Sequence, residues 1–142
     1  MRLFIDCEFN GFDGELISMA LVSDDGREWY AVLPEPRVWD NWCFHNVLPV
    51  ISAEKPTIYA NSMEEFRVSL FAFLGGFERP TFVADWPADI YHLSKVMLGS
   101  RYEQTRHIAC QMELLPNLPD YAPAVPHNAL SDARAIRDAI SQ

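Results

Sequence analysis

The sequence predicts one α/β domain built on a mixed five-stranded sheet with helices on both faces. Three β-rich segments separated by short turns fill the first 33 residues. Helical and strand-like segments then alternate, and a last helical segment follows a proline-rich loop. An antiparallel three-strand meander followed by alternating helices and strands is typical of this class. At 142 residues the chain has the size of one domain, so we expect residues 1–142 to form a single unit.

The meander is predicted by three successive segments. Residues 2–9 are rich in β-forming residues, residues 15–23 form a nearly continuous apolar run, and residues 27–33 alternate with aromatics. Turn-forming residues at 11–14 and 24–26 separate these segments, so the strands should run antiparallel.

Beyond the meander, residues 34–56 have the weakest pattern and predict at most a short helix. The strongest helix signal is the capping box Ser62-Met-Glu-Glu65, which precedes apolar residues at helical spacing. Pro87 is a favourable first residue for another helix. The remaining predicted elements are a helix from Met63 to Leu74, a strand at 81–85, a helix from Pro87 to Leu98, a strand at 106–112 and a helix from Ala129 to Ile140.

Composition restricts the function. Twenty acids against eleven bases give a net charge of -9, which repels nucleic acid unless a bound cation intervenes. The three cysteines are an odd number without C-x-x-C spacing, which argues against a disulfide scaffold and a zinc site. No apolar run is long enough for a bilayer, and Asp6 comes too early for a signal peptide. We therefore expect a cytoplasmic protein with no membrane partner.

Acidic residues lie at two places where chemistry is expected. Asp6 and Glu8 are two residues apart on the first predicted strand, so their side chains leave the same face while Cys7 points away. Because burying two carboxylates is costly without a cation, the pair indicates either a metal site or a strand end that reaches water. Asp85 and Asp89 flank the junction of a strand and a helix, where open α/β sheets bind ligands. Asp89 is also explained as a first-turn acid favoured by the helix dipole.

The last predicted helix opens with His127 and carries Asp132 five residues later. Alanines at 129 and 133 would let this helix approach the sheet closely. Taken alone, His127 is more typical of a surface or capping histidine than of a catalyst, and Asp132 is explained as a solvated acid.

Together these motifs resemble the DEDDh exonucleases of the RNase H-like superfold. The resemblance rests on Asp6-x-Glu8, on Asp89 and on His127-x4-Asp132, in that order along the chain. It implies an RNase H-like fold and a metal-dependent 3′-5′ exonuclease that releases nucleoside 5′-monophosphates. Residues 15–32 and, more faintly, 47–49 are similar to the small bacterial exoribonucleases of the RNase AS type.

The resemblance also implies the cofactor and the catalytic roles. Four carboxylates suit two divalent ions, Mg²⁺ or Mn²⁺, which clamp the attacking and leaving oxygens of a phosphoryl displacement. His127 would be the general base that takes the proton from the attacking water. Ala84-Asp85 stands where the family often has a polar pair, so Asp85 remains an alternative to Asp89 as the third ligand. The implied metal ligands are Asp6, Glu8, Asp89 and Asp132.

The implied substrate is the 3′ end of single-stranded nucleic acid, RNA more than DNA. Phe9, Asn10 and Gly11 are placed to contact the terminal nucleotide, although a core phenylalanine and a turn glycine explain two of them equally well. Arg101 and Arg106 are candidates for phosphate contacts. Similar small exoribonucleases are commonly dimers, which implies a homodimer. The alternatives are a proofreading-type 3′-5′ exodeoxyribonuclease and a non-catalytic RNase H-like module that binds a protein partner.

Overall fold

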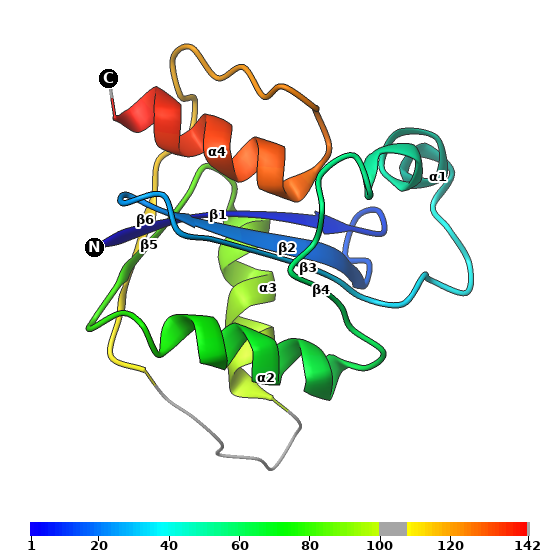
Figure 1. Ribbon diagram of the computed structural model, residues 1–142. Coiled ribbons are helices and arrows are strands. Elements are labelled where there is room, and N and C mark those ends of the chain that lie inside the picture. The colour runs from blue at the N-terminus through cyan, green and yellow to red at the C-terminus, as the bar shows by residue number, and fades with distance from the viewer. Residues whose placement is uncertain (100–107, 142) are drawn as a thin grey trace.

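The computed structural model describes residues 1–99 and 108–141. Its strands are β1 (Arg2–Phe9), β2 (Leu16–Ser23), β3 (Glu28–Val32), β4 (Ile58–Tyr59), β5 (Thr81–Ala84) and β6 (Gln111–Leu114). Its helices are α1 (Asn41–Asn46), the 3-10 turn η1 (Leu48–Val50), α2 (Met63–Leu74), α3 (Pro87–Leu98) and α4 (Ala129–Ile140). The strands form one sheet in the order β4-β3-β2-β1-β5-β6, with α1 and α4 on one face and α2 and α3 on the other (Figure 1). No helix of the described residues is long and apolar enough to cross a membrane.

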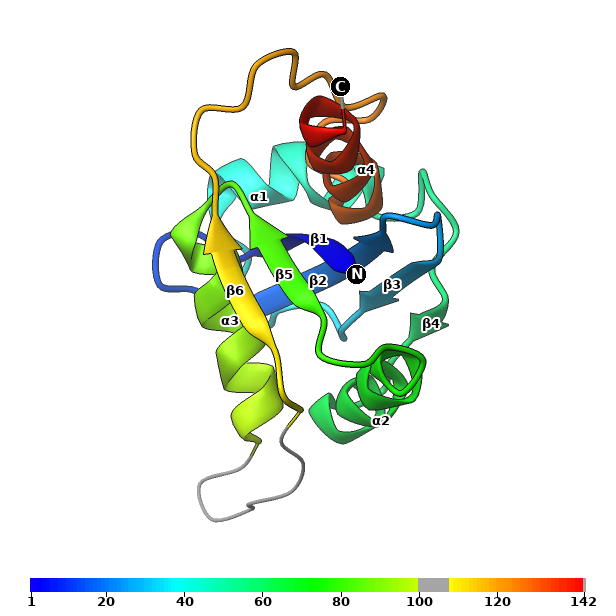
Figure 2. The same ribbon diagram turned by 90° about the vertical axis from the view of Figure 1, so that its left-hand side faces the viewer.

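The sheet is mixed, as the sequence predicts, but it has six strands rather than five. β1, β2 and β3 form the predicted antiparallel meander. β5 runs parallel to β1 and β6 runs parallel to β5, as Figure 2 shows at the open edge. The prediction missed β4, which pairs with Ala31 and Val32 of β3. A strand of two residues is too short to produce a periodic pattern, so only its tertiary pairing identifies it.

The three long helices are confirmed, and one predicted strand is misplaced. α2 begins at the predicted capping box, where the Ser62 hydroxyl accepts the backbone N–H of Glu65 at 3.2 Å. The Glu65 carboxylate accepts the N–H of Asn61 at 2.8 Å, one residue before the expected partner. The strand predicted at 106–112 is wrong in its bounds, because residues 108–110 are irregular and β6 starts at Gln111. Since β6 is exposed along its whole length, burial imposes no apolar pattern on it.

Alternation along β1 divides its side chains between the two layers. Leu3, Ile5 and Cys7 pack into the core beneath α2 and α3. Asp6 and Glu8 therefore leave the opposite face, which α4 covers. Fully buried alanines at 129 and 133 bring α4 against this face, as the sequence predicts.

Candidate metal centre

Five acidic side chains meet at the carboxyl end of the parallel strands β1 and β5. Asp6, Asp85 and Asp89 form one group whose carboxylate oxygens lie within 4.8 Å of one another. Asp6, Glu8 and Asp132 form a second such group. Because Asp6 belongs to both, the structure brings together the four acids singled out from the sequence and the alternative, Asp85.

Local structure fixes two of these acids through backbone hydrogen bonds. Asp89 lies in the first turn of α3, where its Oδ1 accepts the N–H of Cys7 at 3.0 Å. Asp132 lies in the first turn of α4, where its Oδ2 accepts the N–H of His127 at 3.0 Å. Each helix thus presents an acid from its amino-terminal turn, a position that the helix dipole favours.

Two of the five acids are buried and three are partly buried, without a cation from the described part of the chain beside them. Asp89 is 2% exposed and Asp132 is 4% exposed. The Oδ2 atoms of Asp6 and Asp89 are buried and lack a hydrogen-bond partner among the described residues. The ion pairs found within residues 1–99 and 108–141 involve other acids. Since unpartnered buried carboxylate oxygens are costly, the set fits a divalent cation that prefers oxygen ligands, such as Mg²⁺ or Mn²⁺.

Burial raises the pKa of each carboxyl in the cluster. It raises the pKa of Glu8 to about 9, and the negative charges of Asp132 and Asp89 contribute in the same direction. Burial also raises the pKa of Asp89 to about 8. The pKa of Asp6 lies well above its ordinary value because of burial and then the charge of Asp89, and burial raises the pKa of Asp132. At neutral pH the chain alone therefore favours protons on this cluster, and a bound cation would replace them.

His127 lies at the edge of the cluster, just before α4. Its backbone has a φ of 67°, in the left-handed region that few residues other than glycine adopt. Its exposed ring meets Trp42 edge-on, with 4.8 Å between the ring centroids. A positive charge on His127 opposes the burial-driven rise in the pKa of Asp132, so this side chain lies on the same side of the site as that acid.

The three predicted substrate contacts form the turn that follows Glu8. The Phe9 ring stacks on the buried ring of His92, with 4.8 Å between centroids. The Asn10 Oδ1 accepts the N–H of Asp40 at 2.7 Å, so this side-chain amide stabilises the turn. Gly11 has a φ of 78°, and a Cβ there would lie 3.0 Å from Oδ1 of Asp40. These contacts shape the turn beside the acids, and contact with a nucleotide stays a prediction.

Two residues at the site were missed in the sequence analysis. Tyr121, from the proline-rich loop, lies beside Asp132, and burial followed by the Asp132 charge raises the pKa of its phenol. Asn128 is buried and caps α4, because its Oδ1 accepts the N–H of Leu130 at 3.1 Å. Asparagine is a favoured cap, which was a usable sequence signal. No pattern marks Tyr121, because its place depends on the path of a long loop.

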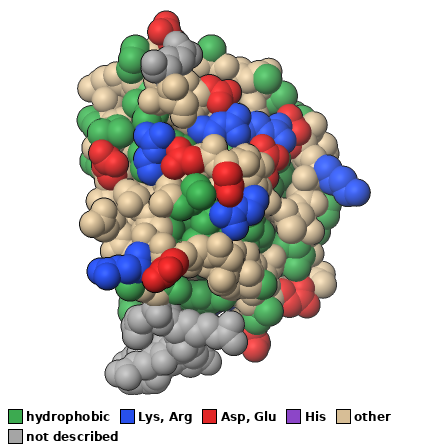
Figure 3. All heavy atoms as spheres, turned by 60° about the vertical axis from the view of Figure 1, so that its left-hand side comes forward, with side chains coloured by type: hydrophobic (Ala, Val, Ile, Leu, Met, Phe, Trp, Pro, Cys, Tyr) green, Lys and Arg blue, Asp and Glu red, His purple; other side chains and the backbone are tan. Residues whose placement is uncertain are grey.

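Basic residues do not gather into a patch on the face that Figure 3 shows, where they are interspersed with acids. Arg2, for example, pairs with Asp24 at 2.8 Å. The candidate phosphate contacts Arg101 and Arg106 lie outside the described residues.

Similarity to known proteins covers part of the chain. Over 78 residues, or 52% of the chain, it is 38% identical to a protein named 3′-5′ exoribonuclease in each of two strains of Mycobacterium tuberculosis. The match covers 46% of each relative, so the chain spans about half the length of the curated relatives it matches. These names support an exonuclease family. No protein-family model matches the chain.

Proposed function

We propose that the chain is a metal-dependent 3′-5′ exonuclease of the DEDDh type, with an RNase H-like fold, that acts on single-stranded RNA. The observation that carries the proposal is the convergence of Asp6, Glu8, Asp89 and Asp132 with two buried carboxylate oxygens that lack a partner among the described residues. The antiparallel meander continued by parallel strands supports the RNase H-like assignment. The partial relatives named 3′-5′ exoribonuclease support RNA as the substrate. The proposed kinship with the RNase AS type rests on the resemblance of residues 15–32.

The carboxylates would hold two divalent cations, Mg²⁺ or Mn²⁺. Bound there, such ions would supply the positive charge that stabilises a phosphodiester transition state. Asp6 belongs to both carboxylate groups and would serve both ions. The hydrogen bond from the Cys7 N–H fixes the Asp89 carboxylate, and the bond from the His127 N–H fixes that of Asp132.

His127 would accept the proton of the attacking water on an imidazole nitrogen. The residue is exposed to solvent, and its ring makes a T-shaped contact with the ring of Trp42. General base catalysis of this kind contributes about 10²- to 10⁴-fold to a rate. Phe9, stacked on His92, offers an aromatic surface beside the acids on which a terminal base would stack.

Digestion of 5′-labelled RNA and DNA oligonucleotides of one sequence tests the proposal. With Mg²⁺ or Mn²⁺ we expect the RNA to shorten one nucleotide at a time from its 3′ end, and with EDTA we expect no cleavage. Preferential shortening of the DNA would instead assign a proofreading-type exodeoxyribonuclease. Absence of cleavage with either metal would contradict the proposal and favour a non-catalytic module.

A further inference from the structure

Asn128 does more than cap a helix. This residue is 1% exposed and lies between His127 and the first residue of α4. Its side-chain oxygen accepts the N–H of Leu130 at 3.1 Å, which is the capping interaction. Its amide nitrogen donates to the backbone carbonyls of Val50 at 2.9 Å and Ile51 at 3.2 Å. One side chain therefore joins the start of α4 to the segment at the end of η1.

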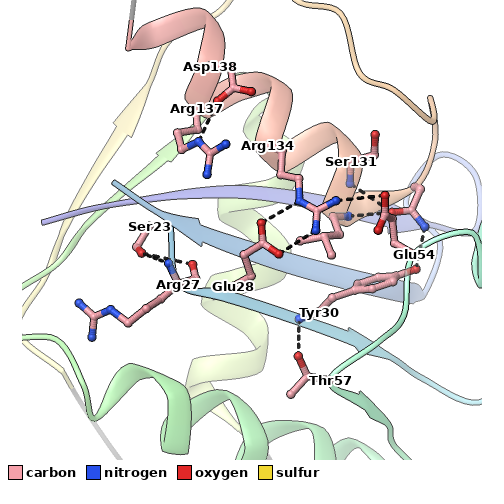
Figure 4. A network of polar contacts seen from close by, with 12 residues as sticks. Ser23, Arg27, Glu28, Tyr30, Glu54, Thr57, Ser131, Arg134, Arg137 and Asp138 are labelled. Carbon is pink, nitrogen blue, oxygen red and sulfur yellow. Dashed lines mark hydrogen bonds and ion pairs between the residues drawn. The ribbon is translucent and has the colours of Figure 1, made fainter. Parts of the chain in front are cut away.

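The acceptor side of this contact is itself held by the sheet. The Tyr30 hydroxyl, from β3, donates to the same Ile51 carbonyl at 2.7 Å. The backbone N–H of Tyr30 in turn donates to the Thr57 hydroxyl at 3.1 Å (Figure 4). Tyr30 is 1% exposed, so this hydroxyl has little freedom to move. The carbonyl that receives the Asn128 amide is thus fixed by a buried side chain of the central sheet.

Capping does not require these donated bonds. A serine or aspartate cap supplies an acceptor oxygen as well as asparagine does, and neither has an amide to donate. The amide of Asn128 reaches a part of the chain 77 to 78 residues away. Its neighbours are the two groups that the proposed reaction needs from this end of α4, His127 and Asp132. His127, whose backbone has the unusual φ of 67°, directly precedes Asn128.

We propose that Asn128 is a positioning residue of the exonuclease reaction, whose amide holds His127 and Asp132 in place relative to β1. This inference rests on the proposed function. We call the two hydrogen bonds that this amide donates the clamp. Their acceptors, the carbonyls of Val50 and Ile51, are its fixed side. Misplacing a reacting group by about 1 Å can cost about 10²-fold in rate, so the clamp acts on turnover more than on substrate affinity.

The variant Asn128→Ser separates the clamp from the cap. Serine keeps an acceptor for the N–H groups of α4 and removes the amide donor. We expect kcat to fall by roughly 10- to 100-fold while KM stays within about twofold, because positioning acts on the transition state. Ser62→Ala, which removes the cap of α2, is the matched control and should leave kcat unchanged. A kcat of Asn128→Ser within about twofold of wild type would overturn the proposal.

Amide hydrogen exchange in EDTA gives a second readout that needs no activity. In Asn128→Ser we expect the His127 N–H, which donates to Asp132, to exchange at least about tenfold faster. The N–H groups of Leu130 and Ser131 should keep their protection, because the serine still caps them. Unchanged exchange of the His127 N–H would overturn the positioning role of Asn128, even if the wild-type chain proves to have no nuclease activity. A failure of the inference is therefore distinguishable from a failure of the proposed function.

Tyr30→Phe serves as the second variant should Asn128→Ser not fold. It removes the hydroxyl that donates to the Ile51 carbonyl and that also accepts from the Asn128 amide at 3.4 Å, while Asn128 keeps its bonds to the carbonyls of Val50 and Ile51. We expect a smaller loss of kcat, about two- to fivefold, and faster exchange of the His127 N–H. Wild-type values of both quantities in this variant would overturn the proposal.

Discussion

Two regions beside α4 differ in whether their acidic side chains have a basic partner. Toward β1, Asp132 faces the buried acids, and burial raises the pKa of Glu8 to about 9. Two residues along the helix, Arg134 donates to Glu28 at 2.7 Å and pairs with Glu54 at 3.0 Å (Figure 4). The hydrogen bond from Arg134 lowers the pKa of Glu28. In this second region, Arg134 balances the charges of Glu28 and Glu54.

The cluster around Asp6 has no such partner among the described residues. Burying several carboxylates without a cation lowers the stability of a fold, so it is not expected where stability is the only requirement. The comparison therefore supports the proposal that a cation from outside the chain neutralises this cluster.

The largest effect is expected from Asp6→Asn. Because Asp6 belongs to both groups of carboxylates, its loss should lower kcat by several orders of magnitude while the fold persists. Glu28→Gln neutralises an acid of the arginine-paired region and should keep wild-type activity. Near-wild-type cleavage by Asp6→Asn would refute the assignment of the cluster as the active site.

His127→Ala should lower the rate by roughly 10²- to 10⁴-fold and leave Mn²⁺ affinity about unchanged, because a base moves a proton and does not hold the metal. His45→Ala, at an exposed histidine of α1, is the matched control. Single-turnover rates and calorimetric Mn²⁺ titrations measure the two quantities. Loss of Mn²⁺ affinity would make His127 a ligand, and an unchanged rate would make it a bystander.

Asp89 should matter more than Asp85. Asp89 is buried and fixed by the Cys7 N–H, whereas Asp85 is half-buried. We expect Asp89→Asn to lose about 10²-fold or more in kcat and Asp85→Asn less than about tenfold, since a fixed ligand carries more of the metal site. An inactive Asp85→Asn beside an active Asp89→Asn would reverse the assignment.

Neutralising one acid should change the stability in EDTA with opposite signs in the two regions. The pKa of Glu8 is raised from 4.5 to about 9, so its stabilising contribution is complete below pH 4.5 and is lost as the pH rises toward 9. At pH 8, Glu8→Gln should therefore raise the Tm by about 3 to 6 °C. Glu28→Gln, which removes a partly exposed ion pair, should lower the Tm by roughly 1 to 3 °C. Thermal melts between pH 5 and 9 measure both, and a lower Tm for Glu8→Gln would contradict this account.

The parts of the fold that local signals determine could be predicted from the sequence. Ser62 caps α2 and Pro87 is the first residue of α3, and both favour helix starts wherever they occur. The Asn128 cap of α4 is a local signal of the same kind that the sequence analysis did not use. The alternation of β1 placed Asp6 and Glu8 on one face for the same reason. The resemblance to the DEDDh exonucleases, carried by the order of the acids along the chain, then brought them together as a hypothesis.

What escaped prediction depends on contacts between distant segments. β4 exists because Ala31 and Val32 offer it a partner, and β6 is placed by its pairing with β5 rather than by burial. Tyr121 reaches Asp132 because of the path of a loop that carries no periodic pattern. The amide of Asn128 meets carbonyls that no local rule connects with it.

Calorimetric titration of the metal-free chain with Mn²⁺ tests most directly whether the buried acids are built for an external cation. We predict that the wild-type chain and Glu28→Gln bind about two Mn²⁺ each and that Asp6→Asn loses most of this binding. Absence of Mn²⁺ binding by the wild-type chain, or undiminished binding by Asp6→Asn, would contradict the account.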